Sequence, residues 1–116
     1  MAQVGTGKYT YELIRDFPKL PKGESFGLIS RVATDSQDRL YVFQRKDPPV
    51  MVFDRDGKYL DCWGIRAVKE AHGMKIVDDV VYTTDRTDSV AVAFTLDGKP
   101  LLVLGKRGVH SDTGCG

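Results

Sequence analysis

The sequence has no long hydrophobic run and almost no net charge. No segment approaches the roughly 18 apolar residues that a membrane-spanning helix requires, and the first residues, MAQVGTGKYTYEL, lack the apolar centre of a secretion signal. Seventeen basic and sixteen acidic side chains give a net charge of +1, so no overall field attracts nucleic acid or an anionic membrane. We therefore expect a cytoplasmic protein without nucleic-acid or membrane partners.

Cysteines and helix-forming patterns are also scarce. The two cysteines, Cys62 and Cys115, have neither the spacing of a metal site nor that of a disulfide framework, and we expect Cys62 to pack within a strand. Only residues 65–72, IRAVKEAH, offer a turn or two of helix. The chain of 116 residues, 41% hydrophobic and 28% charged, nevertheless has the size and composition of one globular domain.

What the sequence does contain is an internal repeat with a period of 41 residues. The segment 53–64, FDRDGKYLDCWG, returns as residues 94–105, FTLDGKPLLVLG. The same ungapped match aligns Asp38 with Asp79, Leu40 with Val81, Tyr41 with Tyr82, Arg45 with Arg86, and Asp47 with Asp88. This period lies in the range of β-propeller blades.

Each copy of the repeat divides into short apolar runs, which are typical of strands and too short for helices. The runs are residues 40–43, 50–53 and 59–63 in the first copy and 80–82, 90–94 and 101–104 in the second. The Asp-Gly pairs at 56–57 and 97–98 predict hairpins, because glycine tolerates positive φ. Since the runs are apolar at consecutive positions, we expect both faces of each sheet to be covered.

The predicted fold class is all-β, with two four-stranded antiparallel propeller blades forming a partial β-propeller. We treat residues 1–116 as a single two-blade unit. It consists of a leader at 8–27 with an N-terminal closing strand at 9–13, a first blade at 28–64, a second blade at 65–105 and a tail at 106–116. Two blades leave two outer faces bare, and fewer than about three repeats are usually unstable alone. The sequence therefore favours an oligomer.

The two copies, residues 30–64 and 71–105, resemble consecutive blades of the NHL-type propeller. The motif order Phe-x-Arg, Pro-Val, Phe-Asp, Asp-Gly, Trp-Gly, His-Gly and Thr-Asp is similar to the first part of bacterial proteins related to peptidylamidoglycolate lyase. The resemblance covers roughly residues 9–115. It implies a six-bladed ring that splits peptidyl-α-hydroxyglycine into a peptide amide and glyoxylate. This chain has two such blades and lacks the later blade that carries the family's catalytic tyrosine.

His72, in the segment EAHGMKI, is the candidate metal ligand. A lone histidine beside a glycine is usually a packed or turn residue. The resemblance implies instead that His72 points into a central channel, where three such imidazoles hold a zinc ion and leave one coordination position open. By resemblance only, the main-chain oxygen of Met74 binds a structural calcium ion.

Arg45, in FQRKDPP, is the candidate catalytic residue. The resemblance implies that it handles the carboxylate and hydroxyl of the substrate, which suits a guanidinium because two parallel hydrogen bonds can reach one carboxylate. The alternative is a surface arginine paired with Asp47.

Three functions remain open from the sequence. The favoured one is a self-assembling ring that acts as a binding or assembly scaffold, with a small molecule or peptide in its channel. The others are a zinc-dependent lyase-like enzyme rebuilt from several chains, and a structural fragment that completes another propeller chain. The preferred assembly is a homotrimer, which supplies six blades and brings three His72 side chains near one axis. GTGK (5–8) lacks P-loop spacing, DTG (112–114) lacks a framing strand pair, and His110 receives no role.

Overall fold

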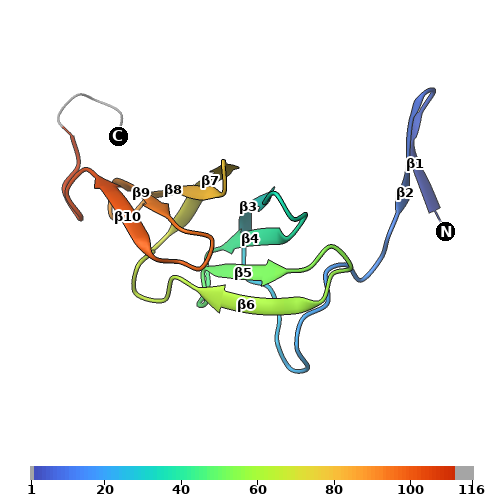
Figure 1. Cartoon of the computed structure of the whole chain (residues 1–116), viewed down its shortest axis with the longest axis horizontal. Helices are drawn as coiled ribbons and strands as arrows, with labels where there is room; N and C mark the ends of the chain where they lie inside the picture. The colour runs from blue at the N-terminus through green and yellow to red at the C-terminus, as the bar shows by residue number, and fades with distance from the viewer. Residues whose placement is uncertain (1, 112–116) are drawn as a thin grey trace.

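The computed structural model describes residues 2–111, and every regular element in this range is a strand. Figure 1 shows two sheets and a separate hairpin at the N-terminal end. The strands are β1 (Ala2–Thr6), β2 (Tyr9–Leu13), β3 (Ile29–Thr34), β4 (Leu40–Gln44), β5 (Val50–Phe53), β6 (Tyr59–Trp63), β7 (Ala71–Val77), β8 (Val80–Asp85), β9 (Val90–Phe94) and β10 (Pro100–Leu104). Nothing in residues 2–111 forms a helix of the length and apolar character that crossing a membrane takes. The predicted all-β class is confirmed.

Two four-stranded antiparallel sheets form the body of the molecule. The first sheet has the order β3-β4-β5-β6 and the second has the order β7-β8-β9-β10, so each strand pairs with the next along the chain. The inner strands β3 and β7 pack against each other, whereas β6 and β10 form the outer edges. Residues 64–70 link the outer strand of the first sheet to the inner strand of the second. The predicted pair of antiparallel four-stranded sheets is confirmed.

The Asp-Gly pairs form hairpin turns, as predicted. Gly57 and Gly98 have φ of 85° and 90°, a region that side chains with a Cβ rarely adopt. In the first turn the Gly57 amide donates to the Asp54 carbonyl oxygen at 3.0 Å. A Cβ on Gly98 would also lie 2.6 Å from the Trp63 ring. The GTGK motif spans the end of β1 and the two-residue turn that leads into β2.

The turn that follows each inner strand differs by one residue between the sheets. Thr34 pairs with Leu40 in the first sheet, and Ile76 pairs with Val81 in the second. Because Leu40 and Val81 are 41 positions apart, Thr34 and Ile76 are 42 apart. Corresponding positions on β3 and β7 therefore differ by 42, and those on the later strands by 41.

The main core lies between the two sheets. On the first sheet it contains Tyr41, Phe43, Val50, Val52 and Trp63, and on the second it contains Met74, Val81, Val90, Val92 and Phe94. Val68 from the connecting segment completes it. The inner face of the first sheet is the face that packs in this core. The outer face of the second sheet is the face that points away from this core.

A smaller cluster covers the opposite face of the first sheet. Val42, Met51 and Phe53 are nearly inaccessible there, and Leu20 and Phe26 of the leader pack on them. The ring of Phe26 lies 6.1 Å from that of Phe53, centroid to centroid. Apolar leader residues thus give part of this face a cover within the same chain.

The expectation that both faces of each sheet are covered holds for β4 and β5 of the first sheet but is wrong for β8 and β10 of the second, where Tyr82 on β8 is 49% exposed. Every residue of β4 from Tyr41 onward and every residue of β5 is buried. In β10 the four residues 101–104 are between 44% and 59% exposed. The reason is that β10 is an edge strand and the outer face of the second sheet has no partner within residues 2–111.

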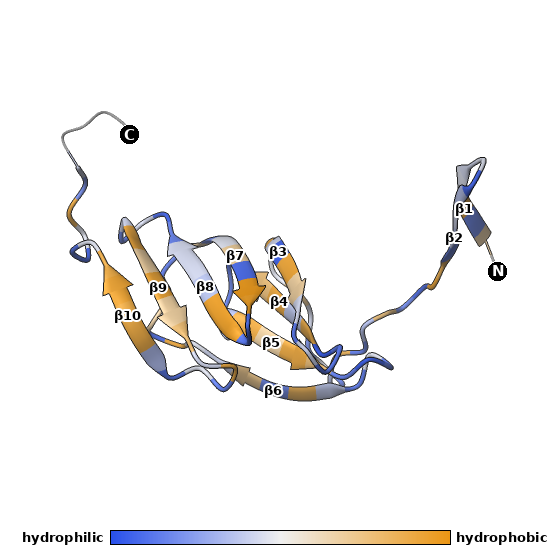
Figure 2. Cartoon of the chain, turned by 45° about the horizontal axis from the view of Figure 1, so that its top comes forward, coloured by the Kyte–Doolittle hydropathy of each residue, from blue (hydrophilic) through white to orange (hydrophobic). Residues whose placement is uncertain are grey.

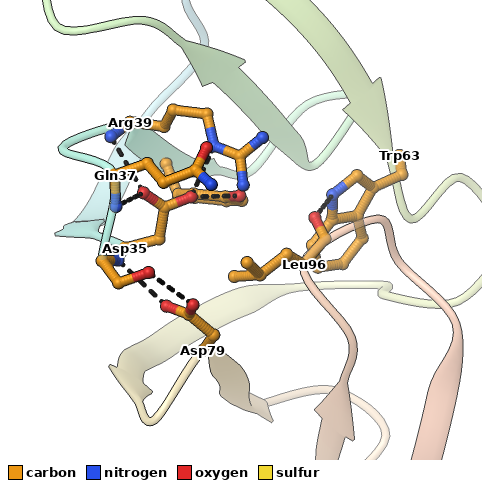
Figure 3. A network of polar contacts seen from close by, with 8 residues as sticks. Asp35, Gln37, Arg39, Trp63, Asp79 and Leu96 are labelled. Atoms are coloured by element: carbon orange, nitrogen blue, oxygen red, sulfur yellow. Dashed lines mark hydrogen bonds and ion pairs between the residues drawn. The ribbon is translucent and has the colours of Figure 1, made fainter.

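A buried carboxylate organises the turn between β3 and β4. Asp35 accepts hydrogen bonds from the amides of Gln37 and Arg39, from the Arg39 guanidinium at 2.6 Å, and from the Tyr41 hydroxyl at 3.0 Å (Figure 3). Burial alone would raise the pKa of Asp35, but these hydrogen bonds outweigh it and hold the pKa below the ordinary value of 3.8. Asp35 is therefore ionised in the folded chain at neutral pH.

We expect Asp35→Asn to lower the free energy of unfolding at neutral pH by about 1–3 kcal/mol, because several donors lose a charged acceptor. Since folding lowers the pKa, the stabilisation is complete above pH 3.8 and disappears as the pH falls through the lower folded value. Urea unfolding of wild type and variant should therefore converge in acid. Asp56→Asn, in an exposed turn, is the control. An unchanged difference between wild type and Asp35→Asn at all pH values would contradict this assignment.

Candidate functional site

Arg45 bridges the two sheets where β4 ends. Its amide donates to the Leu28 carbonyl oxygen at 2.9 Å, which ties it to the leader side of the first sheet. Its guanidinium reaches across to the second sheet, where Nε donates to the Ala71 carbonyl oxygen at 2.9 Å. One Nη atom lies 3.3 Å from the Glu70 carboxylate. The ion partner of Arg45 is thus Glu70, and the alternative pairing with Asp47 is wrong.

Glu70 is shared by two arginines. Arg86 approaches the same carboxylate oxygen as Arg45, at 3.6 Å, and the Thr87 hydroxyl donates to the other oxygen at 2.6 Å. The Thr87 hydrogen bond and then the charges of Arg45 and Arg86 lower the pKa of Glu70. The carboxylate therefore remains ionised and forms an ion pair with Arg45, the residue that the sequence assigned to substrate binding.

Two further carboxylates hold the connecting segments in place. Asp85 accepts hydrogen bonds from the amides of Lys69 at 2.7 Å and Asp88 at 3.1 Å. The buried Asp88 lies 2.9 Å from both Lys69 Nζ and Arg107 Nη1, the first contact being an ion pair without hydrogen-bond geometry. The adjacent Lys69 ammonium and the hydrogen-bonded Arg107 guanidinium lower the pKa of Asp88. We assign Asp85 and Asp88 to structure, since their oxygens face groups of the chain itself.

His72 lies on the inner strand β7 with an exposed side chain. It lines an open pocket of about 920 Å³ on the outer face of the second sheet, together with Thr84, Arg86, Ser89 and His110. The Ser89 hydroxyl contacts His110 Nδ1. The lining of this pocket thus combines two imidazoles and a guanidinium with three hydroxyl residues and the carboxylate of Asp85.

The structure does not bring the predicted site residues into one pocket. Arg45 lines a smaller pocket of about 240 Å³ between the sheets, whereas His72 lines the larger one. The Met74 side chain is 8% exposed and belongs to the core. Among residues 2–111, no three His, Cys, Asp or Glu side chains are grouped so as to hold a metal ion.

Sequence reasoning missed His110 and Glu70. His110 reaches the pocket because Arg107 binds Asp88 and the Gly108 amide donates to the Asp88 carbonyl oxygen. No local motif marks that contact. Cys62 is a free, partly exposed cysteine, whereas Cys115 and the DTG motif lie outside the described residues.

Comparison with models of protein families finds no match, and neither does comparison with curated proteins.

Proposed function

We propose that the chain is a two-blade β-propeller module that stacks head to tail into a closed ring of three copies and acts as a binding scaffold around a central channel. The observation that carries this proposal is an asymmetry within the repeat. Positions that form the core on the first sheet recur on the second sheet as an exposed outer face.

The first half of the proposed contact is the outer face of the second sheet. On the inner face of the first sheet, Tyr41 is 1% exposed and Trp63 is 9% exposed, because the second sheet covers them. Their repeat counterparts Tyr82 and Leu104 are 49% and 59% exposed. Both members of each pair come from the same strand position and face the same direction within their sheets. The outer face thus repeats a surface that already binds a sheet.

The second half is the open part of the first sheet. Ile29 and Val32 on β3 are 48% and 56% exposed. At the spacing of 42, they correspond to Ala71 and Met74 on β7, which are 1% and 8% exposed in the core. Stacking this face on the outer face of another copy repeats the contact between the two sheets of one chain.

The leader is compatible with this stacking. Phe26 of the leader corresponds, again at 42 positions, to Val68 of the connecting segment. Val68 packs between the two sheets, so Phe26 is expected to pack between the sheets of two copies in the same way. Head-to-tail contacts of this kind form a ring when the rotation closes. Three copies provide the six blades that the resemblance implies.

A lyase-like enzyme is the second candidate, favoured by the exposed imidazole of His72 on an inner strand. In such a ring three His72 side chains would supply neutral imidazoles to a zinc ion, which would polarise a substrate oxygen. We rank this candidate below the scaffold, because Glu70 and the Ala71 carbonyl oxygen already engage Arg45. A fragment that completes another propeller is the third, and it would be isolated as a single chain.

Native mass spectrometry distinguishes these functions, because it reports the number of chains and the bound ions together. We expect three chains, and we expect His72→Ala to keep three chains while losing any central metal ion or anion. Lys106→Ala, at an exposed tail residue that does not line the pocket, is the control. A mass of one or two chains would contradict the ring, and stoichiometric zinc in the wild type would favour the enzyme.

A further inference from the structure

The N-terminal hairpin is a small sheet with one apolar face. Cross-strand partners share a face, so Ala2 with Leu13, Val4 with Tyr11, and Thr6 with Tyr9 lie on one side. Gln3 with Glu12 and Gly5 with Thr10 lie on the other. On the first side, Val4, Tyr9, Tyr11 and Leu13 are between 40% and 63% exposed. We call this side the apolar face of the hairpin.

The hairpin packs on neither sheet. Among the described strands, β1 and β2 pack only against each other, and Figures 1 and 2 both show the hairpin standing away from the body. An isolated two-stranded hairpin is marginally stable in water. Its exposed aromatic and aliphatic side chains therefore indicate a partner surface.

The strand β10 offers such a surface at the far end of the molecule. Its outer edge is unpaired among the described residues, and Figure 2 shows it as largely hydrophobic. Leu102 and Leu104, 53% and 59% exposed, pair with Ala93 and Ala91 and so lie on the outer face of the second sheet. Residues 101–104 carry no charge that would protect an open edge, and edges of this kind pair with other strands.

We infer that the hairpin of one copy adds to the β10 edge of the neighbouring copy, so that its apolar face lies beside Leu102 and Leu104 and extends the outer face of that sheet. This inference rests on the proposed ring. In head-to-tail stacking, the first sheet of one copy lies on the second sheet of the next, and the hairpin leaves the chain on the side of its first sheet (Figure 1). It is thereby carried to the neighbour's β10, whereas its own β10 lies at the opposite end.

The place where the leader attaches to the first sheet agrees with this position of the hairpin. The Lys19 amide donates to the Gly57 carbonyl oxygen at 2.9 Å, in the turn between β5 and β6. That turn belongs to the outer part of the first sheet, and β10 is the outer strand of the second. β2 and β10 each span five residues, so their ladders can pair along the whole length, as in strand addition to a sheet edge.

Disulfide trapping tests the contact in the full-length chain. In a background with Cys62→Ser and Cys115→Ser, the pair Tyr11→Cys and Leu102→Cys should give chains covalently linked between copies. Gln37→Cys with Leu102→Cys is the control, because Gln37 is exposed in the turn between the inner strand β3 and its neighbour β4. A three-chain mass with no linkage above the control would overturn the proposed contact between the hairpin and β10, but it would still agree with the ring. A single-chain mass would overturn both.

A second pair of variants does not depend on the register of pairing. Tyr11→Glu puts a charge on the apolar face of the hairpin, and Thr10→Glu puts the same charge on the polar face. We expect Tyr11→Glu to raise the concentration needed for half assembly by about tenfold or more, since desolvating an unpaired charge opposes docking. Thr10→Glu should leave it nearly unchanged. Equal effects of the two substitutions would overturn the assignment of the apolar face to the contact.

Discussion

Replacing Trp63 by alanine is expected to lower the free energy of unfolding by about 3–5 kcal/mol. Trp63 ends β6 and is 9% exposed, and its ring lies 5.0 Å from that of Phe94 on the second sheet. Its Nε1 atom donates to the Leu96 carbonyl oxygen at 3.1 Å (Figure 3). The substitution removes contacts between the two sheets as well as a hydrogen bond, so a large fraction of the total stability is at stake.

Urea unfolding measures this effect, and Trp63→Phe provides the control. Phenylalanine keeps an aromatic ring and loses the indole donor, so its cost should be well below that of alanine. If Trp63→Ala unfolded at the same urea concentration as the wild type, the contact between the sheets would not be the main core of the chain.

Leu104→Glu is expected to convert the ring into single folded chains. Leu104 is the repeat counterpart of Trp63 and is 59% exposed in one chain, so a charge there leaves the isolated fold intact. In the proposed ring the same position would be covered by the next copy, and burying an unpaired carboxylate costs several kcal/mol. We therefore expect the circular dichroism spectrum to stay that of a β protein while the solution mass falls to one chain.

Val103→Glu is the matched control for this change. Val103 is the preceding residue of β10 and is 44% exposed, but its side chain lies on the opposite face of the strand. The control should retain the mass of the wild type. Dissociation by both variants to the same extent would show that charge on β10, and not the outer face, controls assembly.

The middle strands were predictable from the sequence, and the inner strands were much less so. β4, β5 and β9 are apolar at nearly all consecutive positions, and both faces of β4 and β5 are covered by other residues of the chain. The inner strands β3 and β7 mix polar and apolar residues, and each has a break in pairing register, at Ile29/Arg31 and Ala71/Met74. Such irregularities shift the alternation of side chains, which removes the sequence pattern.

Strand β1 was missed for a different reason. Its sequence, AQVGT, contains one β-branched aliphatic residue and a glycine, a weak strand signal. The glycine is required by the hairpin, since a Cβ on Gly5 would lie 2.0 Å from the Tyr9 carbonyl oxygen. Pairing with Tyr9–Leu13 therefore explains a strand that composition alone argues against.

The candidate site was only partly accessible from the sequence. Arg45 and His72 stood out by residue type and by resemblance, but the partner of Arg45 is Glu70, 25 positions away in the segment that links the sheets. The pocket around His72 is completed by His110, which depends on the contact of Arg107 with Asp88. Contacts of this range are set by the packing of the sheets, so no local motif predicts them.

Light scattering on the purified chain, coupled to size-exclusion chromatography, tests the central claim most directly. The two exposed sheet faces, around Tyr82 and Leu104 on one side and Ile29 and Val32 on the other, support head-to-tail stacking. The resemblance implies that such a stack closes after six blades. The expected result is a single species of three times the chain mass of 12.9 kDa, constant over a wide range of concentrations. A mass of one or two chains at all concentrations would contradict the ring.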